Sequence, residues 1–359
     1  MKACRHLILN RKKMRNIVEH IHSTRNLSLE ELATLMTSDD AEGVKYLFQK
    51  AHETAQRVYG NKIFMRGLIE ISNHCKNDCL YCGIRRSQQG VKRYRLTKEE
   101  ILECCEQGYA LGFRTFVMQG GEDGWFDDER MCDIVSTIHE RYPDCAITLS
   151  LGERPRESYQ RLYDAGANRY LLRHETADPK HYALLHPAEM SFENRQRCLR
   201  DLKEIGYQVG CGFMVGSPYQ TLECLYQDLQ LIRRLAPEMV GIGPFIPATG
   251  TPFADRPAGT VEATLRLLAI IRLIHPTVLL PATTALGTLH PQGRELGILA
   301  GANVVMPNLS PKSHRKEYSI YDNKLATGSE AAESANEIRS ALHKIGAEAP
   351  ADRGDYLEN

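Results

Sequence analysis

The sequence predicts an α/β protein: a (β/α)8 barrel of the TIM type over residues 61–310, preceded by a helical extension over 1–60 and followed by a helical cap over 311–359. Eight short apolar or β-branched runs occur after residue 60, and each is followed by a polar loop and an amphipathic stretch. Strands that alternate with helices form parallel sheets, and eight such units fill about 250 residues. A six-strand partial barrel with a C-terminal cap is the competing interpretation.

The N-terminal 60 residues lack strand-like runs. Their apolar residues recur at helical spacing in two groups: Ile17, Val18 and Ile21, then Leu29, Leu32 and Leu35. Ser28 stands where a helix cap is expected, directly before Leu29. This pattern indicates helices ahead of the barrel.

The barrel segment contains the eight runs in regular order. They are Ile63–Ile71, Thr115–Met118, Ala146–Leu151, Tyr170–Leu172, Gln208–Val215, Met239–Phe245, Val278–Pro281 and Asn303–Met306. The intervening segments are of helical type. Thr97 and Glu100 form a capping box at the start of one helix, and the Glu262–Ile274 stretch has a clear apolar face.

Unusual polar residues and turns gather where seven of these strands end. They are Cys75–Cys82, Gly120–Asp123, Thr148 with Ser150, Arg173–Glu175, Gly243–Pro247, Thr283 with Thr284, and Met306–Asn308. In a barrel of this type the carboxyl ends of the strands carry the active site. We therefore expect these groups to share one face of the molecule.

The composition favours a cytoplasmic enzyme. Lys plus Arg and Asp plus Glu both number 45, so the balance gives no electrostatic case for nucleic acid or an anionic membrane. The first residues resemble no signal peptide, and no apolar stretch approaches the length of a membrane span. Of the eleven cysteines, most are scattered singly and three form one tight cluster. Metal binding in a reducing compartment explains this pattern better than a disulfide framework.

Cys75, Cys79 and Cys82 have the spacing C-x3-C-x2-C. Three thiolates on one loop can bind three irons of a [4Fe-4S] cluster and leave the fourth iron open to a small chelating molecule. S-adenosylmethionine (SAM) can chelate that iron through its amino and carboxylate groups. The spacing therefore predicts a cluster and SAM as cofactors, with Tyr81 placed to pack against the adenine.

Two other kinds of metal site fit this spacing less well. A structural zinc site usually needs four ligands in paired knuckles, and no second C-x2-C follows downstream, although His74 stands beside Cys75. A ferredoxin-type site needs a fourth cysteine and different spacing. Because Cys224 is the last cysteine, the C-terminal third cannot hold a second cysteine-ligated cluster. The cysteines outside the motif are interpreted as buried core thiols.

Three further groups are candidates for binding SAM or substrate. Gly120 and Gly121 permit close approach to a ligand, and Glu122 can receive an ammonium group. Strand alternation sends Arg173 and Glu175 to one side, where the arginine can grip an anion and the glutamate a ribose or amine; an internal salt bridge is the alternative. Arg195, near the start of a helix, can grip the SAM carboxylate or lie on the surface.

Several longer motifs resemble one family. They are Ile69–Asn73 with Cys75–Arg86, Gly121–Asp123, Thr148–Glu153, Tyr170–Thr176, Ser191–Arg195, Val240–Pro247, Pro281–Thr284 and Gly301–Pro307. Over roughly residues 60–310 these resemble the HydE family of [FeFe]-hydrogenase maturases, a biotin synthase-like branch of the radical SAM superfamily. Biotin synthase and methylornithine synthase share the cluster and barrel but do not combine the Tyr170–Thr176 and Val240–Pro247 motifs.

The resemblance implies a role in assembling the di-iron subcluster of the hydrogenase. In the family's proposed chemistry, a 5′-deoxyadenosyl radical attacks the sulfur of a cysteine bound to an iron carbonyl-cyanide complex, which a sister maturase delivers. Sister maturases and an electron donor are the implied partners. The implied SAM contacts are Glu122, Glu175, Arg195 and Met306. The implied substrate pocket consists of Thr148, Arg173, Met239, Thr283 and Thr284.

The sequence departs from the family at two points, and two other functions stay open. Some members have serine where Gly120 stands, and some have a C-terminal cluster that this chain cannot form. A radical SAM amino-acid mutase such as methylornithine synthase shares the chemistry. A non-enzymatic carrier of iron–sulfur clusters belongs to another class and needs no SAM site.

Overall fold

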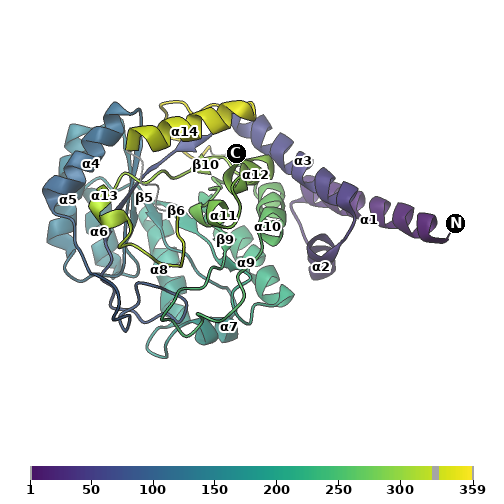
Figure 1. The fold of residues 1–359 in the computed structure, drawn as a ribbon, viewed down its shortest axis with the longest axis horizontal. Coiled ribbons are helices and arrows are strands. Elements are labelled where there is room, and N and C mark those ends of the chain that lie inside the picture. The colour runs from purple at the N-terminus through teal and green to yellow at the C-terminus, as the bar shows by residue number, and fades with distance from the viewer. Residues whose placement is uncertain (1, 326–330, 358–359) are drawn as a thin grey trace.

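The computed structural model describes residues 2–325 and 331–357, and its centre is a parallel β-barrel surrounded by helices (Figure 1). Six strands pair in parallel, in the order in which they follow one another along the chain. They are β2 (Gly67–Ser72), β3 (Thr115–Gly120), β4 (Ala146–Ser150), β5 (Arg169–Leu171), β6 (Gln208–Cys211) and β8 (Met239–Val240).

Shorter pairings close this sheet into a barrel. Leu279 pairs with Met239, and Pro281 pairs with Val304, so the expected Val278–Pro281 strand is present as two isolated bridges. β10 (Val304–Val305) then pairs with β1 (Phe64–Met65), which precedes β2. β7 (Met214–Val215) and β9 (Gly243–Pro244) form a further parallel pair. The prediction of eight strands is confirmed, and the partial barrel is wrong.

Helices connect the strands around the outside of the barrel. They are α4 (Lys98–Ala110), α5 (Asp128–Arg141), α6 (Arg156–Asp164), α7 (Pro179–Leu185), α8 (Phe192–Ile205), α9 (Leu222–Leu235), α10 (Val261–Ile274), α11 (Thr284–Leu289) and α12 (Gly293–Leu299). Thr97 caps α4 in the expected capping box with Glu100. None of the described helices combines the length and the apolar character that crossing a membrane requires.

The N-terminal extension is helical, as expected, and it covers α10. It consists of α1 (Lys2–Thr24), α2 (Leu29–Thr37) and α3 (Ala41–Tyr59), which lie to one side of the barrel (Figure 1). The sequence indicated one apolar face on α10, but the helix is buried on every side, Arg266 and Arg272 included. Arg266 reaches the carbonyl oxygens of Leu35 and Ser38 at 2.7 and 2.9 Å. These bonds satisfy the guanidinium that the extension buries.

The C-terminal segment is less helical than the expected cap. It contains only α13 (Lys312–Arg315) and α14 (Ala331–Lys344) among its described residues, and 326–330 and 358–359 lie outside the description. Its first part crosses the carboxyl ends of the strands, where Asn73 and Gly83 donate hydrogen bonds to the carbonyls of Glu317 and Ile320. Its last part hydrogen-bonds to Ile63 and Thr115 at the opposite end. The segment therefore contacts both ends of the barrel.

Candidate functional site

The loop after β2 carries the three motif cysteines as free, half-buried thiols. The backbone amide of Glu122 donates to Cys75 Sγ at 3.4 Å, and the amides of Asn77 and Ile84 donate to Cys75 and Cys82. Amide hydrogen bonds to cysteine sulfur tune the potential of iron–sulfur clusters. The loop thus surrounds its cysteine sulfurs with backbone N–H groups, which stabilise the thiolate form.

Burial opposes ionisation of these thiols when they have no metal. It raises the pKa of Cys75, raises that of Cys79 well above its ordinary value, and raises that of Cys82 to about 12. Coordination to a cation deprotonates a thiol outright. The donor set therefore fits an iron cluster, whose positive charge offsets the burial. Among the described residues, no three His, Cys, Asp or Glu side chains are grouped closely enough to hold a single metal ion.

The loop after β3 packs directly onto the cysteine loop, and Gly121 makes this possible. A Cβ at Gly121 would lie 2.2 Å from the His74 carbonyl oxygen and 2.7 Å from Cys75 Cβ. At Gly120 the nearest atom would be 3.3 Å away, which a small side chain tolerates with slight adjustment. The Glu122 side chain lies over Gly152, and Lys76 approaches its Oε2 at 3.2 Å.

Gly121→Ala is expected to displace the cysteine loop and lower its iron content. Overpacking of this kind typically costs about 1–3 kcal/mol, because backbone atoms must move. Chemical denaturation and iron analysis after anaerobic reconstitution measure the two effects. Gly124→Ala is the matched control, since its Cβ would meet no atom within 4 Å. Full iron loading in Gly121→Ala would show that the two loops need not touch.

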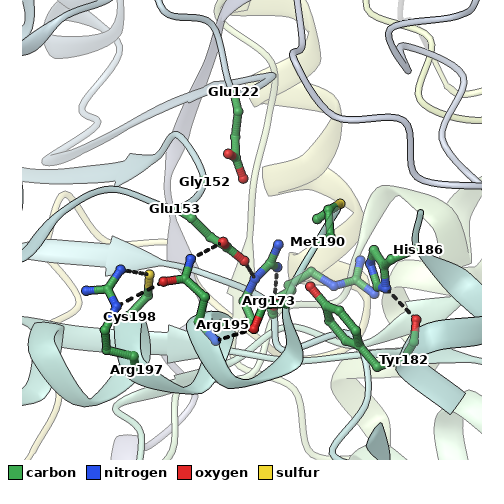
Figure 2. A network of polar contacts seen from close by, with 12 residues as sticks. Glu122, Gly152, Glu153, Arg173, Tyr182, His186, Met190, Arg195, Arg197 and Cys198 are labelled. Carbon is green, nitrogen blue, oxygen red and sulfur yellow. Dashed lines mark hydrogen bonds and ion pairs between the residues drawn. The ribbon is translucent and has the colours of Figure 1, made fainter. Parts of the chain in front are cut away.

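A cluster of charged side chains lies beyond the end of β5. It includes Arg173, Glu153 and Arg195, and Arg195 lies on α8 (Figure 2). Arg173 Nη2 lies 3.1 Å from Glu175 Oε2, so the two residues face one another and form the internal salt bridge that the sequence left open as the alternative. Arg195 is buried rather than on the surface; its Nε donates to Glu153 at 2.5 Å and its Nη1 to the Arg173 carbonyl at 2.6 Å. These contacts hold both arginines at the same end of the barrel.

His174 and Asp228 fix the backbone beneath this cluster. Gly212 N–H donates to His174 Nδ1 at 3.2 Å, so the ring hydrogen resides on Nε2, which lies 3.2 Å from Asp228 Oδ1. The same oxygen accepts from Ala177 N–H at 2.5 Å. Between these anchors Glu175 adopts the left-handed conformation, with φ of 63°, which costs energy for a non-glycine residue. The anchors therefore hold Glu175 in the turn that directs it toward Arg173.

Asp228→Ala is expected to destabilise the protein by about 1–3 kcal/mol for each buried donor that loses its acceptor. The loss leaves the His174 ring N–H and the Ala177 amide without their acceptor. Asp228→Asn retains an acceptor oxygen, so it should fold and show a smaller loss of stability together with weaker SAM binding. Thermal unfolding and SAM titration measure these effects. A stable Asp228→Ala protein with unchanged SAM affinity would contradict the anchoring role.

Several buried polar atoms in the barrel have no hydrogen-bond partner among the described residues. They include Thr148 Oγ1, Arg173 Nε and Nη2, Glu175 Oε2 and Thr283 Oγ1. Buried polar groups are normally satisfied, and an exception calls for a missing ligand or water. These atoms belong to four of the residues singled out from the sequence. A bound polar ligand is the simplest source of their missing partners.

The other expected site residues lie in different surroundings. Thr284 begins α11, directly after Thr283. Tyr81 packs in an apolar cluster with Phe245, and its hydroxyl donates to His186 Nε2 at 3.2 Å, because the neutral His186 ring donates through Nδ1 to the Tyr182 carbonyl. Burial lowers the pKa of His186 to about 3, so this ring is neutral. An adenine contact of Tyr81 stays a prediction.

Met239 lies deeper in the barrel than expected for a residue of a strand-end pocket. Its Sδ lies 2.8 Å from Arg66 Nη1, and it packs with Leu171 and Leu279 in a small cluster against which Met306 also packs. Met239 lines a small cavity there together with Thr148. Its role in substrate binding stays a prediction.

Sequence reasoning missed three residues that shape the site: Glu153, Met190 and Asp228. Glu153 accepts a hydrogen bond from Arg195. The sulfur of Met190 lies 3.6 Å from the sulfur of Cys79. Asp228 lies on α9, far in sequence from His174. Of these residues, only Glu153 could have been noticed in the sequence, because it is the last residue of the Thr148–Glu153 motif. The others are recognisable only when the fold brings them beside the motif residues.

Comparison with known proteins identifies clear relatives. Residues 69–232 match the family model of the Radical SAM superfamily. The chain is 43% identical over 311 residues to the [FeFe] hydrogenase maturase subunit HydE of Thermotoga maritima, covering 87% of this chain and 88% of that protein. It is 29% identical over 321 residues to 3-methylornithine synthase of Methanosarcina barkeri, covering 89% and 88%.

Solved structures share the fold. The crystal structure of methylornithine synthase superposes with a TM-score of 0.82 at 28% identity, covering 93% of this chain and 97% of that one. The [FeFe]-hydrogenase maturase HydG superposes with a TM-score of 0.76 at 22% identity, covering 96% and 78%. At that level of identity, the second likeness concerns the fold alone.

Proposed function

The chain belongs to the HydE family of [FeFe]-hydrogenase maturases within the radical SAM superfamily, and from this premise we propose that it acts on a cysteine-bound iron carbonyl-cyanide complex during assembly of the di-iron subcluster. The observation that carries the proposal is the group of buried polar atoms without hydrogen-bond partners around Arg173, in the same barrel as the three cysteines. An anionic ligand would supply acceptors for Arg173 Nε and for the hydroxyls of Thr148 and Thr283, which have none among the described residues.

The cofactors are held by residues at the carboxyl ends of the strands. Cys75, Cys79 and Cys82 hold the [4Fe-4S] cluster, and the family resemblance assigns SAM to Glu122, Glu175, Arg195 and Met306. When bound together, cluster and SAM supply a one-electron cleavage that yields the 5′-deoxyadenosyl radical. Arg195 has both Nε and Nη1 engaged by Glu153 and Arg173, so its orientation is set before any ligand arrives.

The proposed substrate site contains one cation, Arg173, and the neutral hydroxyls of Thr148 and Thr283. Arg173 is ion-paired with Glu175 through Nη2, but its Nε has no hydrogen-bond partner among the described residues, so it can grip an anion through a charge-assisted pair. The hydroxyls of Thr148 and Thr283 can orient that anion without adding an acid or base. The C-terminal segment contacts both ends of the barrel, which helps to exclude water from a reactive radical.

Maturation on this account needs other proteins. A sister maturase would deliver the iron complex, and an electron donor would reduce the cluster before each cleavage. The organometallic substrate itself is small enough to enter a barrel. These partners follow from the chemistry of the proposed reaction, which begins with an external electron and a preformed iron complex.

Anaerobic reconstitution followed by two assays tests the proposal. With dithionite, the protein should convert SAM to 5′-deoxyadenosine; with its partner maturases, it should activate apo-hydrogenase. Failure to bind SAM would favour a cluster carrier. SAM cleavage without hydrogenase activation would exclude the maturase role.

An amino-acid mutase is the second candidate, because methylornithine synthase superposes over 93% of this chain. Such an enzyme would consume lysine in the presence of SAM, whereas a maturase would leave lysine unchanged. Incubating reconstituted protein with SAM, dithionite and labelled lysine distinguishes them. Formation of a lysine isomer would replace the maturase proposal.

A further inference from the structure

One cluster ligand lines a pocket that opens on the surface. Cys75 borders this pocket together with His74, Lys76, Arg86, Arg95 and Asp123. Glu122, an implied SAM contact, also lines this pocket, whereas Thr148, Arg173 and Thr283 of the proposed substrate site do not. An external protein can therefore approach this pocket without entering the proposed substrate site.

The exposed charge around the pocket is mainly positive, although each cation has a carboxylate partner. The side chains of Lys76, Lys92 and Arg95 are 64%, 79% and 36% exposed. Their partners Glu122, Glu317 and Asp123 are only 10%, 14% and 4% exposed. The carboxylates thus point inward and the cations outward. Arg86, whose partner Glu189 is equally exposed, is the exception.

Trp125, the one tryptophan of the chain, lies beside this pocket and is 41% exposed. Arg130 and Arg95 lie over its ring, with Cζ at 4.8 and 5.8 Å from the centroid. Its amide donates to Asp123 Oδ1 at 3.1 Å, and its carbonyl accepts from Arg130 at 3.2 Å. A fixed, exposed tryptophan among arginines is typical of the residues that dominate protein–protein binding.

The same loop connects Trp125 with the cluster ligand. Trp125 follows Glu122 by three residues, and the Glu122 amide donates to Cys75 Sγ at 3.4 Å. Asp123, between them, is fixed by Ser72 at 2.7 Å and by Arg95. A partner bound at Trp125 would therefore sit next to the backbone that contacts the cluster sulfur.

We propose that the face formed by Lys76, Arg86, Lys92, Arg95 and Trp125, here called the donor face, binds an acidic one-electron carrier protein that reduces the cluster. This inference rests on the proposed function, which requires an external electron. Docking forms and breaks no covalent bond: the carrier loses one electron and the cluster gains it. Complementary charge brings such partners together quickly, and the effect weakens with salt.

Binding can be measured apart from activity. An oxidised flavodoxin of net negative charge is the probe, titrated calorimetrically into the reconstituted protein at low and high salt. We expect binding that weakens with salt and a Kd raised about tenfold or more by Trp125→Ala or Arg86→Glu. Arg233→Glu, an exposed charge reversal in the last turn of α9, is the control and should leave the Kd unchanged.

Activity assays separate this inference from the proposed function. With reduced flavodoxin, Trp125→Ala and Arg86→Glu should raise the KM for the carrier while dithionite-driven SAM cleavage and iron content stay at wild-type levels. Wild-type affinity in both variants would overturn the donor face, as would tighter binding of nucleic acid than of flavodoxin. Loss of dithionite-driven cleavage in the wild-type protein would instead overturn the proposed function.

Discussion

Replacing Cys79 with alanine is expected to abolish both the cluster and SAM cleavage. The loop supplies only three cysteine ligands, so each thiolate holds one iron and none has a substitute nearby. The neighbour of Cys79 is Met190, whose thioether is a poor replacement for an anionic thiolate. Iron analysis after reconstitution should fall from four irons per chain to near none, and 5′-deoxyadenosine should be undetectable.

Cys132→Ala is the control for this experiment. Cys132 is also half-buried, but it lies on α5, away from the cysteine loop. Its loss should leave the iron content and SAM cleavage unchanged. A Cys79→Ala protein that kept a stable cluster and cleaved SAM would mean that the ligands are elsewhere in the chain.

Arg173→Ala is expected to spare SAM binding and to remove hydrogenase maturation. Arg173 is ion-paired with Glu175 through Nη2, but its Nε lacks a hydrogen-bond partner among the described residues, so the loss of Arg173 would leave a bound anion unpaired. A hydrogen bond to a charged group contributes about 1.5–3 kcal/mol, which corresponds to roughly tenfold or more in substrate affinity. SAM affinity by calorimetry and hydrogenase activation in vitro measure the two effects separately.

Arg173→Lys completes the test, because lysine keeps the charge but not the planar fork. We expect it to recover part of the maturation activity, with SAM affinity near the wild-type value. The Arg195 bond to the Arg173 carbonyl involves the backbone and should persist in both variants. Equal loss of SAM binding and maturation in Arg173→Ala would show that this residue belongs to the SAM site.

The barrel could be predicted because local signals agree with the final topology. Each strand has an apolar run, and the capping boxes at Ser28 and Thr97 fix where α2 and α4 begin. Long-range pairing was harder to foresee. The Val278–Pro281 strand is held by two bridges alone. The C-terminal segment binds through backbone hydrogen bonds and through ion pairs with residues far away in the sequence, such as Asp355 with Arg169.

The candidate site likewise has features that local sequence predicts and features that depend on tertiary contacts. The cysteine spacing reflects local chemistry, so the motif was readable without a structure. Arg173 and Glu175 do lie on one side, as an ion pair, but both follow the end of β5 at Leu171, so strand alternation does not account for their positions. The partnership of His174 with Asp228 joins residues 54 positions apart, and the left-handed turn at Glu175 depends on that tertiary contact. The inward position of Met239 likewise depends on barrel geometry.

The charge exposed at the donor face does not follow from the numbers of charged residues in the sequence. The whole chain has zero formal net charge, which argues against a strongly basic surface. Yet at this face the carboxylates paired with Lys76, Lys92 and Arg95 are turned inward, whereas Glu189 is as exposed as its partner Arg86, so the local surface differs from the average composition. Such an asymmetry arises from packing of the loop after β3 and has no sequence signature.

The most direct measurement is electron–nuclear double resonance of the reduced, oxygen-free protein mixed with SAM that is isotopically labelled in its amino nitrogen. We expect hyperfine coupling between that nitrogen and one iron of a [4Fe-4S] cluster, because three cysteines leave one iron free for it. A protein that contains only zinc, or a cluster with all four irons already ligated by the chain and no coupling to the label, would contradict the account.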